Sequence, residues 1–185
     1  MNDIFLERES VYMRNYVRIG ALLLIIVPLL LVFSGCEQGP DTVDIASVNM
    51  NDITLSAPDL AKHMLDTLTF DDALVPVDPA VAEHIYYVAG KYTDIAAYSS
   101  TGATAEAILV LRCESASAAE TAAASVEKYR TEMAEVYAGY NKKESGKLTD
   151  ALLVCDGRYV VFCVSPDTAA ALDAYHAYVV AQAQK

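Results

Sequence analysis

The stretch ALLVCDGRYVVFCV (Ala151–Val164) decides the fold, because it places Asp156-Gly157 between two apolar runs. An Asp-Gly pair in this setting predicts a two-residue hairpin turn. The resulting register pairs Cys155 with Arg158, Leu153 with Val160, and Ala151 with Phe162. Alternation then places a second set of side chains on the other face: Leu152, Val154, Tyr159, Val161 and Cys163. Both faces are largely apolar, so we expect the sheet to be covered on both sides, at least in part.

A second strand–turn–strand pattern lies upstream of this hairpin. Strands are predicted near Tyr92–Tyr98 and over Thr104–Cys113, with the small and hydroxylated residues SSTGA between them as a turn. A helix follows, with Ser117 and Glu120 as its capping box and apolar residues at helical spacing to Tyr140. We expect it to end at Gly139 and the lysine-rich stretch Asn141–Lys147. After the hairpin, Ser165-Pro166-Asp167 predicts the start of a C-terminal helix.

Two further helices are predicted before the first strand. Ser56 and Asp59 form a capping box for a helix that runs to Leu68, with Pro58 in its first turn. Asp78-Pro79 opens a shorter helix to about Tyr86. The segment between them, Thr69 to Val77, is predicted to be a loop.

These elements give a strand–strand–helix unit twice. We predict an α+β fold: a four-stranded, mostly antiparallel sheet built from the two units, with both unit helices on one face. The Ser56–Leu68 helix would cover part of the other face. Whether the two units are a true repeat stays open, because alanine-rich helices begin alike in any case.

The N-terminal 35 residues have the pattern of a secretory signal. Arg14 and Arg18 precede the apolar run Ile19–Phe33, whose fifteen residues would rise about 22 Å as a helix, short of a bilayer core of about 30 Å. Basic residues before such a run and small residues after it indicate a cleaved signal peptide. An uncleaved signal anchor is the alternative, and both place the rest of the chain outside the cell.

The signal ends in Phe33-Ser34-Gly35-Cys36, which resembles a bacterial lipobox. The resemblance implies that Phe33, Ser34 and Gly35 are the signal-peptidase recognition residues, and that the Cys36 thiol takes up the lipid. Phe33 departs from the usual leucine. Acylation would anchor the protein in the membrane, because two acyl chains bind firmly where one is marginal. The alternative is a free cysteine after an ordinary signal peptide.

The chain therefore divides into a signal peptide (1–35), a lipidated cysteine with a flexible tether (36–55) and a single extracytoplasmic domain (56–185). The net charge is −12. Residues 1–35 carry three acids and three bases, so their removal leaves it unchanged. This charge repels phosphate backbones, and nucleic acid is not expected as a partner.

The domain is similar to the DUF4358 family, an uncharacterised lipoprotein family of Gram-positive anaerobes. The resemblance runs from about Leu55 to the C-terminus and is most specific over Tyr98–Arg112, where Ala105-Glu106 enters a strand, and over the Leu152–Val164 hairpin. It implies a surface lipoprotein, and it supplies no catalytic or binding residue.

The residues themselves indicate no catalytic site, cofactor or metal site. Cys113, Cys155 and Cys163 form no Cys-x-x-Cys motif, and the histidines lack ligand spacing. An incomplete acidic loop (Asp71, Asp72 and Asp78) lacks the spacing of an EF-hand. The best candidate binding site is the turn after the first strand, since loops on rigid hairpins often carry recognition. Its residues are Tyr98, Ser99, Ser100, Thr101 and Gly102; the alternative is an ordinary polar turn.

Tyrosine is the one conspicuous side chain: ten tyrosines and two phenylalanines follow Cys36. Tyrosine suits the margin of a core as well as an interface. We expect a non-enzymatic, lipid-anchored extracytoplasmic module that binds an envelope protein or another envelope component. A small-ligand carrier or sensor is the alternative, and an enzyme with an unrecognised site is a third possibility.

Overall fold

The computed structural model describes Ile45, residues 48–50 and residues 52–185. The predicted signal peptide, the lipobox and Cys36 lie outside the described residues. Two described residues of the predicted tether, Met50 and Leu55, are 6% and 1% exposed and belong to the core. The backbone N–H of Leu55 donates to the Tyr159 hydroxyl at 2.9 Å. The folded domain therefore extends N-terminally beyond the expected start at Ser56.

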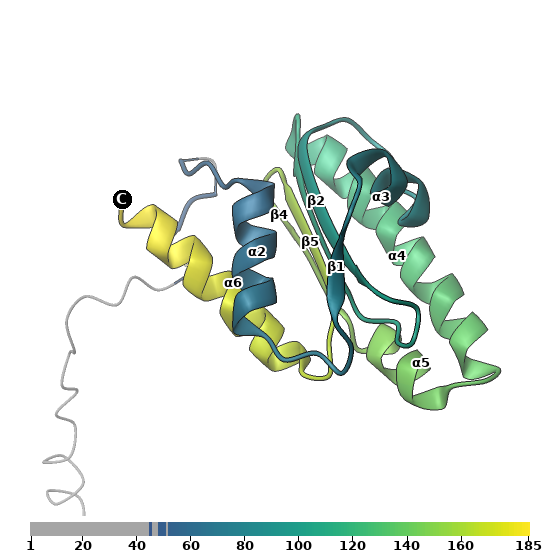
Figure 1. The fold of residues 1–185 in the computed structure, drawn as a ribbon. Helices are drawn as coiled ribbons and strands as arrows, with labels where there is room; N and C mark the ends of the chain where they lie inside the picture. Colours follow the sequence, from purple (N-terminus) through teal and green to yellow (C-terminus); the bar gives the residue numbers. More distant parts are fainter. Residues whose placement is uncertain (1–44, 46–47, 51) are drawn as a thin grey trace, which may run out of the picture. The chain divides into compact units, whose positions relative to one another are not determined.

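The domain is built on one antiparallel sheet of five strands, not the four that were predicted (Figure 1). The strands are β1 (Leu74–Val77), β2 (Tyr92–Ser100), β3 (Ala107–Cys113), β4 (Leu152–Asp156) and β5 (Tyr159–Val164). Their spatial order is β1-β2-β3-β5-β4, so β1 and β4 are the two edges. The α+β class is thus confirmed, and the strand number is corrected.

The unpredicted strand is β1, which lies in the segment expected to be a loop. It has four residues and contains Pro76, which removes a backbone donor and argues against a strand on sequence grounds. The backbone N–H of Ser100 donates to the Glu106 carbonyl, so the backbone groups of Ser100 point toward β3. Every second residue of a strand points the same way, so the N–H and C=O of Tyr98 also point toward β3. Pro76, opposite Tyr98, therefore directs its nitrogen to the open edge, where a missing N–H costs no ladder bond.

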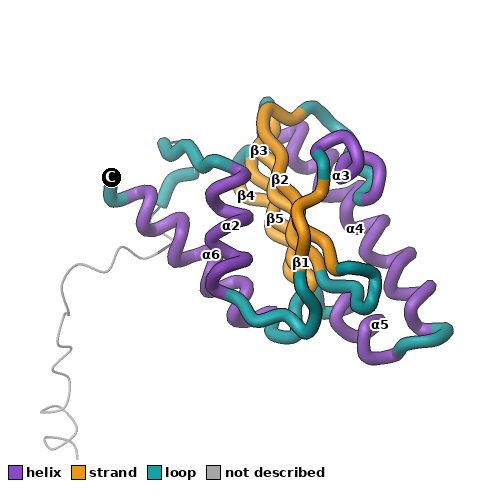
Figure 2. The backbone as a smooth tube through the Cα atoms, in the orientation of Figure 1, coloured by secondary structure: helices purple, strands orange, loops and turns teal. Residues whose placement is uncertain are grey.

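Helices cover both faces of the sheet (Figure 2). One face carries α2 (Ala57–Thr67) and α6 (Thr168–Ala183), and the other carries α3 (Pro79–Ile85), α4 (Ala116–Ala138) and α5 (Lys142–Thr149). The prediction that the two unit helices, α4 and α6, share a face is wrong. A two-fold axis that exchanges the antiparallel neighbours β3 and β5 is perpendicular to the sheet. It would therefore keep the helices of both units on the same face. The two halves are therefore not related by that symmetry.

Strand β3 forms the centre of both core layers. Ile108 and Val110 point toward α2 and α6, whereas Leu109 and Leu111 point toward α3 and α4, and all four are 0% exposed. Full burial of each such side chain contributes about 1.5–3 kcal/mol. The continuous apolar run of β3 thus reflects a strand covered on both faces, as expected for the sheet.

The β4–β5 hairpin forms, but its register differs from the prediction by two residues. Asp156 pairs with Tyr159 and Cys155 with Val160, so the loop is Gly157-Arg158 instead of Asp156-Gly157. Gly157 has φ +57°, which suits the first central position of a two-residue turn. A shift of two preserves alternation, and each predicted face is therefore retained.

The helix starts are partly as predicted. The Ser56 hydroxyl accepts from the N–H of Asp59 at the start of α2. Helix α4 begins two residues earlier than predicted, with Ser115 as its N-cap in place of Ser117. The lysine-rich stretch, expected only to end the preceding helix, itself forms α5 (Lys142–Thr149) with Asn141 as its N-cap. No helix in the described part of the chain combines the length and apolar character needed to cross a membrane.

Candidate binding site at the hairpin tip

The tip of the β2–β3 hairpin is held by its own hydroxyl groups. The Ser100 hydroxyl donates to the Thr104 carbonyl at 2.6 Å, and the N–H of Gly102 donates to Ser100 Oγ at 3.3 Å. Gly102 has φ +102°, a conformation that other residues rarely adopt. The tip is thus a closed polar loop at the end of a rigid hairpin, where recognition loops are commonly found.

Helix α4 faces this tip with a row of large side chains at helical spacing. Tyr129, Met133 and Tyr137 lie one turn apart, and the Tyr137 hydroxyl donates to the Thr104 carbonyl at 3.3 Å. Between helix and hairpin lies a pocket of about 130 Å³, which we call the tip pocket. It is lined by Ser99, Ser100, Gly102, Thr104, Ala105, Ala107, Tyr129, Met133, Tyr137 and Leu148. At about 30 Å³ per water molecule, it has room for roughly four waters or a single side chain.

The aromatic floor beside the tip pocket is packed edge to face. Tyr129 contacts Tyr86 and Phe162 with ring centroids 5.0 and 6.1 Å apart. Burial raises the pKa of Tyr86 to about 12, against the opposing effect of a hydrogen bond with Ser99. Burial also raises the pKa of Tyr129. The ring of Tyr129 thus forms part of a well-packed wall of the pocket.

Apolar side chains exposed to solvent surround the tip pocket. Val136 in α4 and Tyr140 just after its C-terminus are 54% and 69% exposed, and the ring of Tyr140 packs on that of Tyr137, with centroids 5.1 Å apart. On the other side Val75, 47% exposed, lies directly opposite Ser99 across the β1–β2 ladder. Directly paired residues point to the same face, so Val75 lies on the pocket side of the sheet. The tip pocket is thus hydroxylated inside and apolar at its rim.

Behind the tip lies a group of charges, which we call the ionic cluster: the exposed Asp71 and the buried Glu106, Glu144 and Lys147. The Lys147 ammonium contacts Asp71, Glu106 and Glu144 at 2.8, 2.8 and 3.0 Å. Glu106 is 0% exposed and also accepts from the N–H groups of Asp71 and Asp72 at 3.0 and 2.9 Å. Glu144 accepts from the N–H of Ala105 at 2.9 Å.

Contacts within the ionic cluster favour the charged forms of Asp71 and Lys147. Bonds from Lys143, then from Lys147, lower the pKa of Asp71 to about 2. Burial acts to lower the pKa of Lys147, but its bonds to Asp71, Glu106 and Glu144 outweigh burial and raise it above the usual lysine value. Glu106 accepts from two backbone N–H groups and from Lys147, and Glu144 accepts from one backbone N–H and contacts Lys147. The cluster thus ties the segment before β1, the hairpin tip and α5 together.

The three aspartates of the incomplete acidic loop have separate roles. Asp71 belongs to the ionic cluster, Asp72 accepts from the hydroxyl and N–H of Thr101 at 2.8 and 3.0 Å, and Asp78 caps α3. Among the described residues, no group of three or more His, Cys, Asp or Glu side chains is arranged to hold a metal ion.

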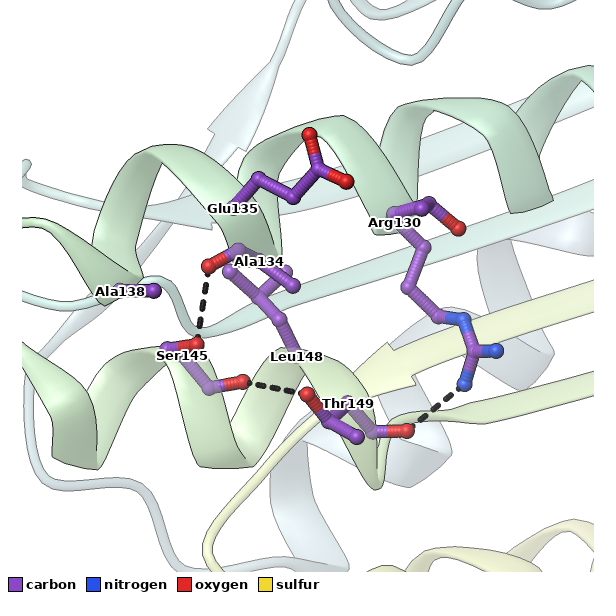
Figure 3. Close-up of a pocket in the computed structure, with 8 residues that line it drawn as sticks. Arg130, Ala134, Glu135, Ala138, Ser145, Leu148 and Thr149 are labelled. Atoms are coloured by element: carbon purple, nitrogen blue, oxygen red, sulfur yellow. Dashed lines mark hydrogen bonds between the residues drawn. The ribbon is translucent and has the colours of Figure 1, made fainter.

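A second hollow, of about 300 Å³, lies between α4 and α5 (Figure 3). Its polar groups bond to backbone carbonyls: Ser145 to Ala134 at 2.8 Å, Thr149 to Ser145 at 3.0 Å and Arg130 to Thr149 at 2.9 Å. The Ser145 and Arg130 bonds fasten the two helices to each other, and the Thr149 bond lies within α5. We therefore regard this hollow as a helix-packing seam, and the tip pocket as the better candidate site.

The cysteines and histidines form no shared site in the described part of the chain. Cys113 and Cys163 are buried, Cys155 is exposed, and all three are free thiols. Cys155 and Cys163 belong to opposite faces of the sheet, as the predicted alternation required. His63 lies between α2 and α6, with its ring 5.3 Å from that of Tyr178. Its Nε2 is buried without a hydrogen-bond partner.

The structure separates the five predicted binding residues into two groups. Ser99, Ser100 and Gly102 line the tip pocket, whereas Tyr98 packs toward the opposite face and Thr101 bonds to Asp72. The sequence did not reveal that α4 supplies the opposite wall. The only signal for the ionic cluster was Ala105-Glu106, a charged residue at the head of an apolar strand.

The DUF4358 family model, described as a domain of unknown function, matches residues 82–165. The matched segment spans most of α3 and all of β2 to β5, and it contains every residue that lines the tip pocket. Residues 82–165 therefore match the DUF4358 family, as the sequence resemblance had indicated. Neither the search of curated proteins nor the search of solved structures returned a match.

Proposed function

We propose that this protein is a non-enzymatic, lipid-anchored extracytoplasmic lipoprotein that binds an envelope protein through the tip pocket. The observation that carries the proposal is a small hydroxylated pocket with an exposed apolar rim formed by Val75, Val136 and Tyr140. Protein interfaces combine a central pocket that takes an anchor side chain with aromatic surroundings that exclude water. The ionic cluster supports this role, because it fixes the pocket wall before a partner arrives.

The anchor belongs to the same proposal. Its support is the Phe33-Ser34-Gly35-Cys36 stretch after an apolar run. Acylation at Cys36 would concentrate the domain at the membrane surface, where a partner held in the same plane meets it at a raised effective concentration. A weak pocket contact would then suffice for function.

A small-ligand carrier or sensor is less well supported. Pockets that enclose such ligands usually measure about 300–1,000 Å³. The tip pocket measures about 130 Å³, and the seam between α4 and α5, about 300 Å³, has Arg130, Ser145 and Thr149 bonded to backbone carbonyls. Two larger hollows, about 550 Å³ beside α5 and about 490 Å³ beside α3, are open at the surface and do not enclose a ligand. An enzyme is disfavoured because the buried carboxylates of the ionic cluster are saturated by donors.

The test is site-specific photocrosslinking of the full-length protein in its own membrane. A photoreactive residue at Tyr140 reports on the pocket rim, and one at Ala177, exposed on α6 across the sheet, serves as the control. We expect one dominant adduct from position 140, identified by mass spectrometry, and none from position 177. A Cys36→Ala variant should lose both the lipid label and the adduct.

A pocket-filling variant makes the test specific to the site. Ala105→Leu directs extra carbons into the tip pocket, whereas Ala103→Leu, in the same turn, changes an exposed residue that does not line it. Loss of the adduct in Ala105→Leu with retention in Ala103→Leu would support binding in the pocket. Equal adducts in both variants would contradict it.

A further inference from the structure

We propose that two copies of this protein pair through their β4 edges, antiparallel and about a two-fold axis at Val154. The two five-stranded sheets would then form one continuous sheet across the dimer. Strand addition at a free sheet edge is a common mode of association, and a two-fold axis makes the contact self-complementary.

Strand β4 is one of the two edges of the sheet, and no described strand pairs with its outer side. Its sequence, LLVCD, contains no proline and no lysine, and its pairing with β5 is regular over all five residues. The opposite edge, β1, is shorter and carries Pro76 with its nitrogen directed outward. Natural sheets guard their edges with proline, lysine or bulges, and β4 has none of these.

The hairpin determines which backbone groups of β4 are free. Asp156 and Tyr159 flank a two-residue loop, so they exchange both of their hydrogen bonds. Alternation then bonds Val154 to Val161 and Leu152 to Cys163. The N–H and C=O groups of Leu153 and Cys155 consequently point to the open edge.

A two-fold axis at Val154 matches these free groups. It pairs Leu153 with Cys155 of the second copy and Cys155 with Leu153 of the second copy, which yields four main-chain hydrogen bonds. It also aligns all five residues of each strand. An axis at Leu153 or Cys155 would pair that residue with itself, and the five-residue strands would overlap less.

Charged side chains at both ends of β4 favour the same axis. Asp150 caps the C-terminus of α5 just before β4, and Arg158 lies in the hairpin loop just after it. The axis therefore brings the Asp150 end of one copy near the Arg158 end of the other, twice per dimer. Both residues are exposed, and neither side chain makes an ion pair within the described ranges. Exposed pairs contribute little energy but determine register well. This complementarity is what points to a second copy of the chain as the occupant.

The net charge of −12 opposes association at low ionic strength. At physiological ionic strength, charges more than about 8 Å apart are largely screened, whereas the contacts within the edge remain. Pairing is therefore expected at physiological salt, and it is favoured when both copies are confined to one membrane.

Disulfide trapping of the full-length protein in membranes tests the proposal. In Val154→Cys/Cys155→Ser, the new thiols lie opposite each other, with Cα atoms about 4.5 Å apart in a non-hydrogen-bonded pair, within disulfide range. Leu153→Cys/Cys155→Ser is the matched control, because its thiols are two positions out of register. Mild oxidation at physiological salt should give a covalent dimer in the first variant only.

Charge reversal then tests the register. Asp150→Arg or Arg158→Asp alone should lower the dimer yield of the Val154→Cys variant by about two- to fivefold, and the combined reversal should restore it. An equal dimer yield in the Leu153→Cys control would overturn the proposal, because it would show that the disulfides form by random collision. Absence of a Val154→Cys dimer in folded protein, verified by circular dichroism, would overturn it as well.

Discussion

The Lys147 ammonium lies 2.8 Å from the Glu106 carboxylate, with the two side chains 6% and 0% exposed. The two residues come from α5 and from the head of β3, 41 positions apart in the chain. Their contact joins the helix that the sequence did not predict to the strand that it predicted best. Because both charges are buried, the stability of the hairpin tip depends on neither being left alone.

Lys147→Met should therefore destabilise the fold by about 3–5 kcal/mol, because it leaves buried carboxylates without their counter-ion. Lys143→Met is the matched control: that side chain is 70% exposed and bonds only to Asp71, so its loss should cost less than about 1 kcal/mol. Urea denaturation of both variants measures the difference. A Lys147→Met variant as stable as Lys143→Met would show that the ionic cluster does not hold the tip.

Stability should fall on acidification between about pH 4 and pH 2. The Asp71 pKa is lowered from 3.8 to about 2 by bonds from Lys143 and Lys147, so its contribution is present above the unfolded-state value. That contribution is lost as the pH falls through the folded-state value. In Asp71→Asn, the stability lost over this interval should be smaller than in the unmodified protein. Identical acid profiles for the two proteins would argue against a charged Asp71 in the folded state.

Tyr87 should be more tolerant of glycine than of alanine. It follows α3 with φ +55°, and the N–H of Val88 donates to the Glu83 carbonyl at 2.9 Å, the arrangement in which glycine is the usual residue. Both variants lose the edge contact with Tyr129, but alanine keeps the backbone strain. We expect the free energy of unfolding of Tyr87→Ala to be about 1 kcal/mol lower than that of Tyr87→Gly. Thermal melts of the two variants decide the order, and the reverse order would contradict it.

His63→Met should stabilise the protein by about 1 kcal/mol. It removes a buried nitrogen that lacks a partner and replaces it with an apolar side chain of adaptable shape. His176→Met, on the neighbouring helix α6, removes no such atom and should leave the melting temperature nearly unchanged. A lower melting temperature for His63→Met would mean that the imidazole makes a stabilising interaction.

The sequence predicted those features that depend on alternation and local capping. The faces of Leu152–Val164 remained correct although the register moved by two residues, because alternation has a period of two. Asp156-Gly157 gave the hairpin but not its loop, since Gly157 can serve at either central position. Ser115 and Ser117 both resemble N-caps, and only the packed structure distinguishes them.

The failures concern choices made by packing. Both faces of the central strands are apolar, so the sequence could not show that α4 and α6 lie on opposite sides. Strand β1 owes its existence to pairing with Ser99 and its neighbours, against the preference of Pro76. The site was predicted in part for the same reason: Ser99, Ser100 and Gly102 have turn chemistry, whereas Tyr129 and Met133 read as ordinary residues of a helix.

Pro76 also limits how far any edge-mediated assembly of this protein can grow. An extended assembly requires that each copy pair with a neighbour through both edges of its sheet. The four residues of β1 offer few outward donors, and Pro76 removes one of them. In the proposed pairing through β4, the blocked β1 edge would stop growth once the second copy is in place. A protein concentrated in the plane of a membrane would thereby be kept from extending into filaments.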